Sequence, residues 1–140
     1  MKLADIMTPK VVTVEKSNSL WEVKMIFENT KFHHLLVTDD SQLVGMLSDR
    51  DYLKAVSPKL GTKEQTASDT ESLNQRVHSI MKSNLHTLKP DSSLFDAMKL
   101  FNDHSISCIP IVDNNNQIEG ILSWRDIFKM IYKKQLENNS

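Results

Sequence analysis

A seven-residue motif occurs twice in this chain of 140 residues and constrains its fold more than any other feature. Gly45-Met-Leu-Ser-Asp-Arg-Asp51 and Gly120-Ile-Leu-Ser-Trp-Arg-Asp126 share Gly-hydrophobic-Leu-Ser-x-Arg-Asp, and each follows an apolar run. The chain has only three glycines, and two of them open these motifs. A glycine permits close backbone approach, and a serine followed three residues later by an acidic residue is typical of a helix start. Each motif therefore predicts a strand end, a tight turn and a helix start.

The repeat extends beyond the motif. An offset of 74 residues (80 − 6) aligns Ile6-Met7 with Ile80-Met81 and Ser19-Leu20 with Ser93-Leu94. One additional residue in the Asn-rich turn after Asp113 raises the offset to 75 (120 − 45) for the motif itself. Self-similarity at this length indicates two copies of one supersecondary unit, arranged as one compact domain or as two packed half-domains.

Apolar periodicity and turn residues predict the order β-α-β-β-α in each copy, which is an α/β (α+β) fold. We expect the first repeat over residues 1–57, a surface linker with a helical turn over 58–76, the second repeat over 77–136 and a frayed tail over 137–140. The expected strands are 11–14, 34–38, 43–47, 85–88, 107–112 and 118–122, and the expected helices are 20–30, 48–56, 94–101 and 124–136.

Composition narrows the class of function. The net charge is −1 and no basic run stands out, so nothing favours binding to nucleic acid or to a membrane surface. No apolar segment has the length of a signal-peptide core or approaches the roughly 20 residues of a membrane span. The single cysteine, Cys108, lies in an apolar run and is expected to be a small buried residue. An internal disulfide is impossible, which fits a cytoplasmic location.

The chain resembles a tandem pair of cystathionine-β-synthase (CBS) domains, also called a Bateman module, of the small stand-alone bacterial type. The likeness is carried by Ile6-Met-Thr8, Ile80-Met81, Ile109-Pro-Ile-Val-Asp113 and both Gly-x-x-Ser-x-x-Asp motifs. Where the family usually has Leu-Pro-Val-Val-Asp, the first copy has Leu35-Leu-Val-Thr-Asp39. The resemblance implies two repeats packed as a pseudo-two-fold pair.

The serine and aspartate of each motif suit a phosphorylated nucleoside. A helix N-terminus with a hydroxyl attracts phosphate, and the carboxylates of Asp51 and Asp126 can accept hydrogen bonds from a ribose diol. The same Ser-x-x-Asp spacing also occurs in capping boxes that bind no ligand, so both interpretations are open.

The resemblance implies that each ligand site combines one repeat's motif with the first two strands of the other repeat. The first site would contain Val11, Val12, His33, His34, Ile121, Ser123 and Asp126. The second site would contain Met46, Ser48, Asp51, Leu85, His86, Ser107 and Cys108.

For His33 and His34, a surface position ranks first, a role as phosphate donors second and metal ligation third. No Cys/His cluster has zinc spacing, so no metal site is expected. If both histidines face the first site, that site should bind a phosphorylated ligand more tightly than the second, and more so at pH 6 than at pH 8.

The predicted function is a regulatory ligand-sensing module that binds an adenine nucleotide such as AMP, ADP or ATP and signals to a protein partner. The alternative is a dimeric interaction scaffold with degenerate ligand sites. An enzyme is not expected, because no nucleophile–base pair or metal set is evident, and no cofactor is required. A homodimer is expected because the second helix of each repeat carries surplus apolar residues, namely Tyr52, Leu53, Val56, Ile127, Phe128, Ile131 and Tyr132.

Overall fold

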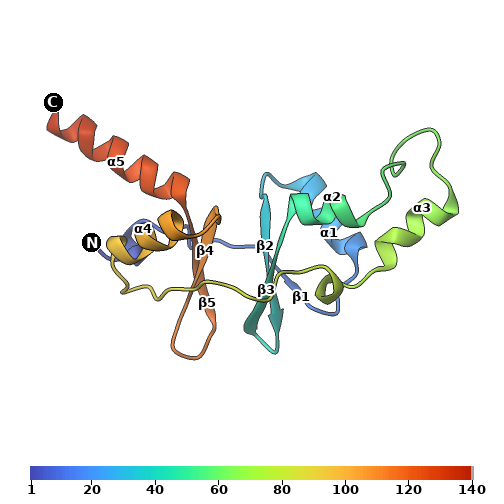
Figure 1. Cartoon of the computed structure of the whole chain (residues 1–140), viewed down its shortest axis with the longest axis horizontal. Coiled ribbons are helices and arrows are strands. Elements are labelled where there is room, and N and C mark those ends of the chain that lie inside the picture. The colour runs from blue at the N-terminus through green and yellow to red at the C-terminus, as the bar shows by residue number, and fades with distance from the viewer. Residues whose placement is uncertain (140) are drawn as a thin grey trace. The chain divides into compact units, whose positions relative to one another are not determined.

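The structure, a computed structural model, describes residues 1–139 and divides into two compact units. One unit is Val12–Leu85, and the other combines Met1–Val11 with the chain from His86 onward. The mixed α/β architecture predicted from the sequence is confirmed (Figure 1).

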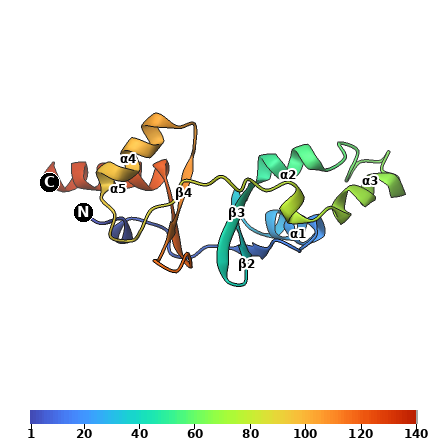
Figure 2. The ribbon, with the colours of Figure 1, turned by 60° about the horizontal axis from the view of Figure 1, so that its bottom comes forward.

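The unit Val12–Leu85 is built on a three-stranded sheet. Strand β1 (Thr13–Glu15) runs parallel to β2 (His34–Asp39), which pairs antiparallel with β3 (Gln42–Ser48). Helices α1 (Leu20–Asn29) and α2 (Asp49–Ala55) lie on one side of this sheet (Figures 1 and 2). The expected linker contains α3 (Ala67–Glu71) and the 3-10 helix η2 (Ser72–Asn74), and η3 (Val77–Ser79) follows. The core of the unit consists of Val14, Leu20, Val23, Leu35, Val37, Leu47, Tyr52, Leu73 and Val77.

The other unit has a smaller sheet. Strands β4 (Cys108–Val112) and β5 (Ile118–Ser123) form an antiparallel hairpin. Along the chain, α4 (Leu94–Asp103) precedes this hairpin and α5 (Trp124–Asn138) follows it. A 3-10 helix, η1 (Leu3–Asp5), contributes Leu3 to a core that also contains Ala97, Ile109, Ile111, Leu122 and Ile127. Helix α5 runs two residues into the expected frayed tail, and the Asn139 N–H caps it by donating to the carbonyls of Gln135 and Leu136. Ser140 lies outside the described residues.

The strand expected over 85–88 is wrong, since only a single parallel bridge joins Leu88 to Ile111. The first repeat shows the reason. There the Leu36 N–H donates to the Val12 carbonyl at 3.2 Å, and Leu36 corresponds to Pro110 in the second repeat. Proline has no N–H, so the equivalent bond to His86 cannot form and the strand is reduced to one bridge.

Each repeat's lead-in segment pairs with a strand of the other repeat. Thr8 exchanges two backbone hydrogen bonds with Ile121 on β5, of 2.8 and 2.9 Å. Lys82 exchanges two with Met46 on β3, also of 2.8 and 2.9 Å. The N-terminal segment, which the sequence analysis grouped with the first repeat, thus packs on the second.

The motif glycines make these pairings possible. A Cβ atom on Gly120 would lie 2.8 Å from the Thr8 carbonyl oxygen and 2.9 Å from the Met7 sulfur. A Cβ atom on Gly45 would meet the Met81 side chain and lie 3.0 Å from the Lys82 carbonyl oxygen. The strand register shifts beside each glycine, between Ile111/Val112 in one repeat and Val37/Thr38 in the other. Such a bulge locally bends the strand.

We predict that Gly120→Ala destabilises the protein by about 1–3 kcal/mol, because the added methyl group would clash with backbone that cannot rotate away. Chemical denaturation measures the change, and Glu119→Ala, on the exposed neighbouring residue, is the control. Equal stability of the two variants would mean that the lead-in segment is not held against β5.

Candidate functional site

The serine and aspartate of both motifs form the predicted capping boxes. The Ser48 N–H donates to Asp51 Oδ2 at 3.0 Å, and the Asp51 N–H donates to Ser48 Oγ at 3.0 Å. In the second motif, the Ser123 N–H donates to Asp126 Oδ2 at 2.9 Å, and the Asp126 N–H donates to Ser123 Oγ at 3.2 Å. The boxes start α2 and α5, and both aspartates are half-buried.

Capping alone does not distinguish these motifs from ordinary helix starts. Helix α4 begins with the same box, in which the Asp96 N–H donates to Ser93 Oγ at 3.1 Å and the Ser93 N–H donates to Asp96 Oδ2 at 3.3 Å. Evidence for a ligand site must therefore come from the residues that surround Asp51 and Asp126.

Around Asp126, the structure gathers residues of β4, β5 and the N-terminal segment. Ser123 lies opposite Cys108 in the hairpin, and the Trp124 N–H donates to the Ser107 carbonyl at 3.4 Å. The Thr8 hydroxyl donates to Asp126 Oδ1 at 3.4 Å. Thr8 was missed as a site residue, although the Ile6-Met-Thr8 motif was a signal for it, because its partner Asp126 is 118 residues away in the chain.

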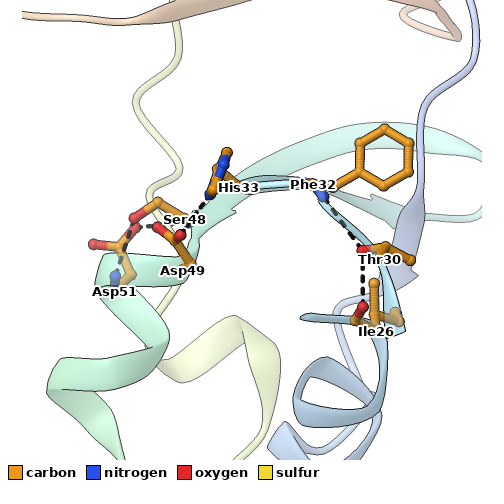
Figure 3. A network of polar contacts seen from close by, with 7 residues as sticks. All are labelled: Ile26, Thr30, Phe32, His33, Ser48, Asp49 and Asp51. Atoms are coloured by element: carbon orange, nitrogen blue, oxygen red, sulfur yellow. Dashed lines mark hydrogen bonds and ion pairs between the residues drawn. The ribbon is translucent and has the colours of Figure 1, made fainter. Parts of the chain in front are cut away.

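Around Asp51, the structure gathers residues of β2 and β3 (Figure 3). His34 lies opposite Ser48 in the sheet register. His33 Nδ1 lies 2.8 Å from Asp49 Oδ2, and the Asp49 N–H donates to the His33 carbonyl at 2.9 Å. The side chain of His33 is 75% exposed, which agrees with the first-ranked surface position.

The predicted sites draw on both compact units. Of the first site, Val11, Ile121, Ser123 and Asp126 belong to one unit and Val12, His33 and His34 to the other. Of the second site, Met46, Ser48, Asp51 and Leu85 belong to one unit and His86, Ser107 and Cys108 to the other. His86 stacks on His104, with ring centroids 4.0 Å apart. We call the residues that each unit gathers around its own aspartate a half-site, and a role of either half-site in ligand binding is a proposal.

Burial lowers the pKa of His34 below its ordinary value. The carboxylates of Asp49 and Asp51 act in the opposite direction, whereas the positive charges of His33 and Lys82 add to the lowering. A lowered pKa means that His34 gains its charge at lower pH than an ordinary histidine, which weakens the expectation that this side chain raises phosphate affinity between pH 8 and pH 6.

Two other features of residues 1–139 bear on function. No group of three or more His, Cys, Asp or Glu in this part of the chain could hold a metal ion. None of the helices over the same residues is both long and apolar enough to cross a membrane.

The CBS domain family profile matches residues 3–58 and 77–133, so this chain belongs to the CBS domain family and carries two copies of the domain. An uncharacterized protein of Methanocaldococcus jannaschii is 28% identical over 99% of this chain and 42% of its own length. A homoserine O-acetyltransferase of Methanococcoides burtonii is 32% identical over 92% of this chain and 24% of its own length. The chain thus spans less than half of the curated relatives it matches, and the CBS pair is the part that they share.

Solved structures of CBS pairs have the same fold. A CBS domain-containing protein of unknown function from Bacillus anthracis superposes with a TM-score of 0.79 at 25% identity, over 96% of this chain and 94% of that one. A CBS domain pair in complex with 5′-methylthioadenosine and S-adenosyl-L-methionine gives 0.76 at 22% identity, over 96% and 98%. The cytosolic domain of the Mg²⁺ channel MgtE in complex with ATP gives 0.74 at 22% identity, over 92% and 48%.

We predict that His34 makes the stability of the fold depend on pH. The unfolded chain takes up this proton near pH 6.5, but the folded chain, with a lowered pKa, resists it. The contribution of His34 is complete above that pH, and stability is lost as the pH falls below it. Denaturation midpoints between pH 7.5 and 5.5 should fall less for His34→Gln than for the parent protein.

The control is His78→Gln, because His78 is exposed and belongs to the same unit. If the His34→Gln and His78→Gln variants lose stability with the same pH slope as the parent, His34 is not protected from protonation in the folded state.

Proposed function

We propose that this chain is a regulatory ligand-sensing module, which binds an adenine nucleotide such as AMP, ADP or ATP in clefts between its two repeats and signals occupancy to a protein partner. The main support for this proposal is that the two carboxylate oxygens of Asp126 are unequally engaged in hydrogen bonds. Oδ2 accepts the Ser123 N–H at 2.9 Å, while Oδ1 has only the longer contact with Thr8 at 3.4 Å. An ionised carboxylate oxygen with acceptor capacity left over suits a ribose hydroxyl.

The ligands of the similar CBS pairs support this choice. 5′-Methylthioadenosine, S-adenosyl-L-methionine and ATP share an adenosine group and differ at the 5′ position. A site that recognises adenine and ribose would accept all of them, and its selectivity would depend on the groups that face the 5′ substituent.

A regulatory role also fits the occurrence of the domain pair as one part of a longer protein. In the homoserine O-acetyltransferase relative, the matching part is 24% of the protein, so most of that chain lies outside the CBS pair. We therefore propose that the pair itself catalyses no reaction, and that its signal passes to an effector through protein contacts.

We predict that Asp126→Asn and Asp51→Asn each weaken adenine nucleotide binding at one site by about 10-fold or more, since a hydrogen bond to a charged group contributes about 1.5–3 kcal/mol. Both variants should fold, because asparagine can still accept the capping N–H. Calorimetry with ADP gives the affinities, and thermal unfolding without nucleotide gives the stability.

Asp96→Asn is the matched control, because Asp96 occupies the same capping position on α4. If all three variants lose similar stability and none loses affinity, the aspartates only cap helices. If the parent protein shows no thermal shift with AMP, ADP or ATP, the scaffold with degenerate sites is the correct function. A ligand at 100 times its Kd should stabilise a binding fold by about 2.7 kcal/mol.

We also propose that the module forms a homodimer through its second helices. Leu53 on α2 is 67% exposed and Phe128 on α5 is 65% exposed, and Ile131 and Tyr132 are exposed as well. Tyr52 and Ile127, which were expected in the same surface, instead pack into the cores of their own units. Exposed apolar residues gathered on one helix are typical of an interaction surface.

Phe128→Glu should convert the dimer to a monomer at micromolar concentration, as read by light scattering, because a carboxylate would be buried in an apolar interface. Phe32→Glu places the same charge on an exposed aromatic residue outside these helices and should leave the dimer intact. A monomeric parent protein would contradict the proposal.

A further inference from the structure

Thr8 and Lys82 occupy equivalent positions in the two half-sites. The offset of 74 residues (82 − 8) aligns them. Each exchanges two backbone hydrogen bonds with the residue that follows a motif glycine, Thr8 with Ile121 and Lys82 with Met46. The two side chains therefore leave the backbone from matching places beside the two Ser-x-x-Asp boxes.

From its position, the Thr8 hydroxyl reaches the carboxylate of Asp126 at 3.4 Å. The equivalent position beside Asp51 carries a lysine, whose side chain is exposed. Its ammonium charge makes a small contribution to the lowered pKa of His34, after burial and after the charges of Asp49, His33 and Asp51. The ion pairs formed within residues 1–139 do not include Lys82. A cation without a carboxylate partner therefore lies beside the Asp51 half-site, where the Asp126 half-site has a neutral hydroxyl.

The charged positions of the two motifs do not cancel this difference. Arg50 and Arg125 are equivalent and are present in both motifs. Asp49 replaces Trp124 and adds a negative charge near Asp51, but its Oδ2 lies 2.8 Å from His33 Nδ1 and is thereby engaged. Among these positions, Lys82 is the positive charge that the Asp51 half-site has and the Asp126 half-site lacks.

We propose that Lys82 makes the Asp51 half-site selective for an adenine nucleotide with two or more phosphates, while Thr8 directs the Asp126 half-site to a ligand with one phosphate or none. This inference rests on the proposed function. A lysine ammonium binds phosphate by charge-assisted hydrogen bonds, which are roughly twice as strong as neutral ones. A threonine hydroxyl adds no charge and already contacts the aspartate. The order of phosphate preference is the reverse of that expected from the histidines alone.

Calorimetry measures the affinities of ADP and AMP for the parent protein and for the Lys82→Thr and Lys82→Met variants. The same three proteins are also measured with the Asp126→Asn substitution added, so that the Asp51 site accounts for the remaining binding. The backbone pairing of residue 82 with Met46 does not need the lysine side chain, and thermal unfolding without nucleotide checks that the variants fold. We expect both Lys82 variants to weaken ADP binding about 10-fold and AMP binding less than about 3-fold. Lys63→Thr, on an exposed lysine of the same unit, should change neither.

The reciprocal variant, Thr8→Lys in an Asp51→Asn background, should raise the ADP preference of the remaining site. If the Lys82 variants keep the parent's ratio of ADP to AMP affinity while Asp51→Asn abolishes binding at that site, the inference is overturned and the proposed function stands. If the parent binds neither nucleotide, both are overturned.

Discussion

The backbone pairing of each lead-in segment with a strand of the other repeat is the interaction on which the rest of the structure depends. It joins Thr8 to Ile121 and Lys82 to Met46 by two hydrogen bonds each. It brings Leu3 into the core formed by β4, β5 and their helices, and it brings Val77 into the core of the unit Val12–Leu85. It also places one side chain beside each Ser-x-x-Asp box. The two motif glycines are required because the strands approach too closely for a Cβ atom.

This exchange means that the two aspartate half-sites differ through residues outside the motif. The two boxes make the same pair of hydrogen bonds, both of 3.0 Å between Ser48 and Asp51 and of 2.9 and 3.2 Å between Ser123 and Asp126. The paired segment supplies one difference, a threonine in one case and a lysine in the other, and the motif supplies another, Asp49 in place of Trp124. We propose that the duplicated fold thereby responds to two ligands of different charge while both aspartates hold ribose in the same way.

Local signals made much of this predictable. The serine caps follow from Ser-x-x-Asp spacing, and the hairpins follow from apolar runs that flank short polar turns. The loss of the strand at 85–88 was in principle readable from Pro110, because a proline N cannot donate to a neighbouring strand. The strands that pair with Thr8 and Lys82 could not be located from the sequence, although the Ile6-Met-Thr8 motif drew attention to Thr8, since the partners are distant in the chain and the pairing uses backbone hydrogen bonds that any residue type can make. The burial of His34, which lowers the pKa of its imidazole, is likewise a property of the packed sheet.

We propose that Asp51 and Asp126 hold the ribose of an adenine nucleotide. A crystal structure of the protein grown with excess ADP tests it most directly. We expect ribose hydroxyls within hydrogen-bond distance, about 2.5–3.0 Å, of a carboxylate oxygen of Asp51 or Asp126. A nucleotide bound elsewhere, or with its ribose turned away from both aspartates, would contradict it.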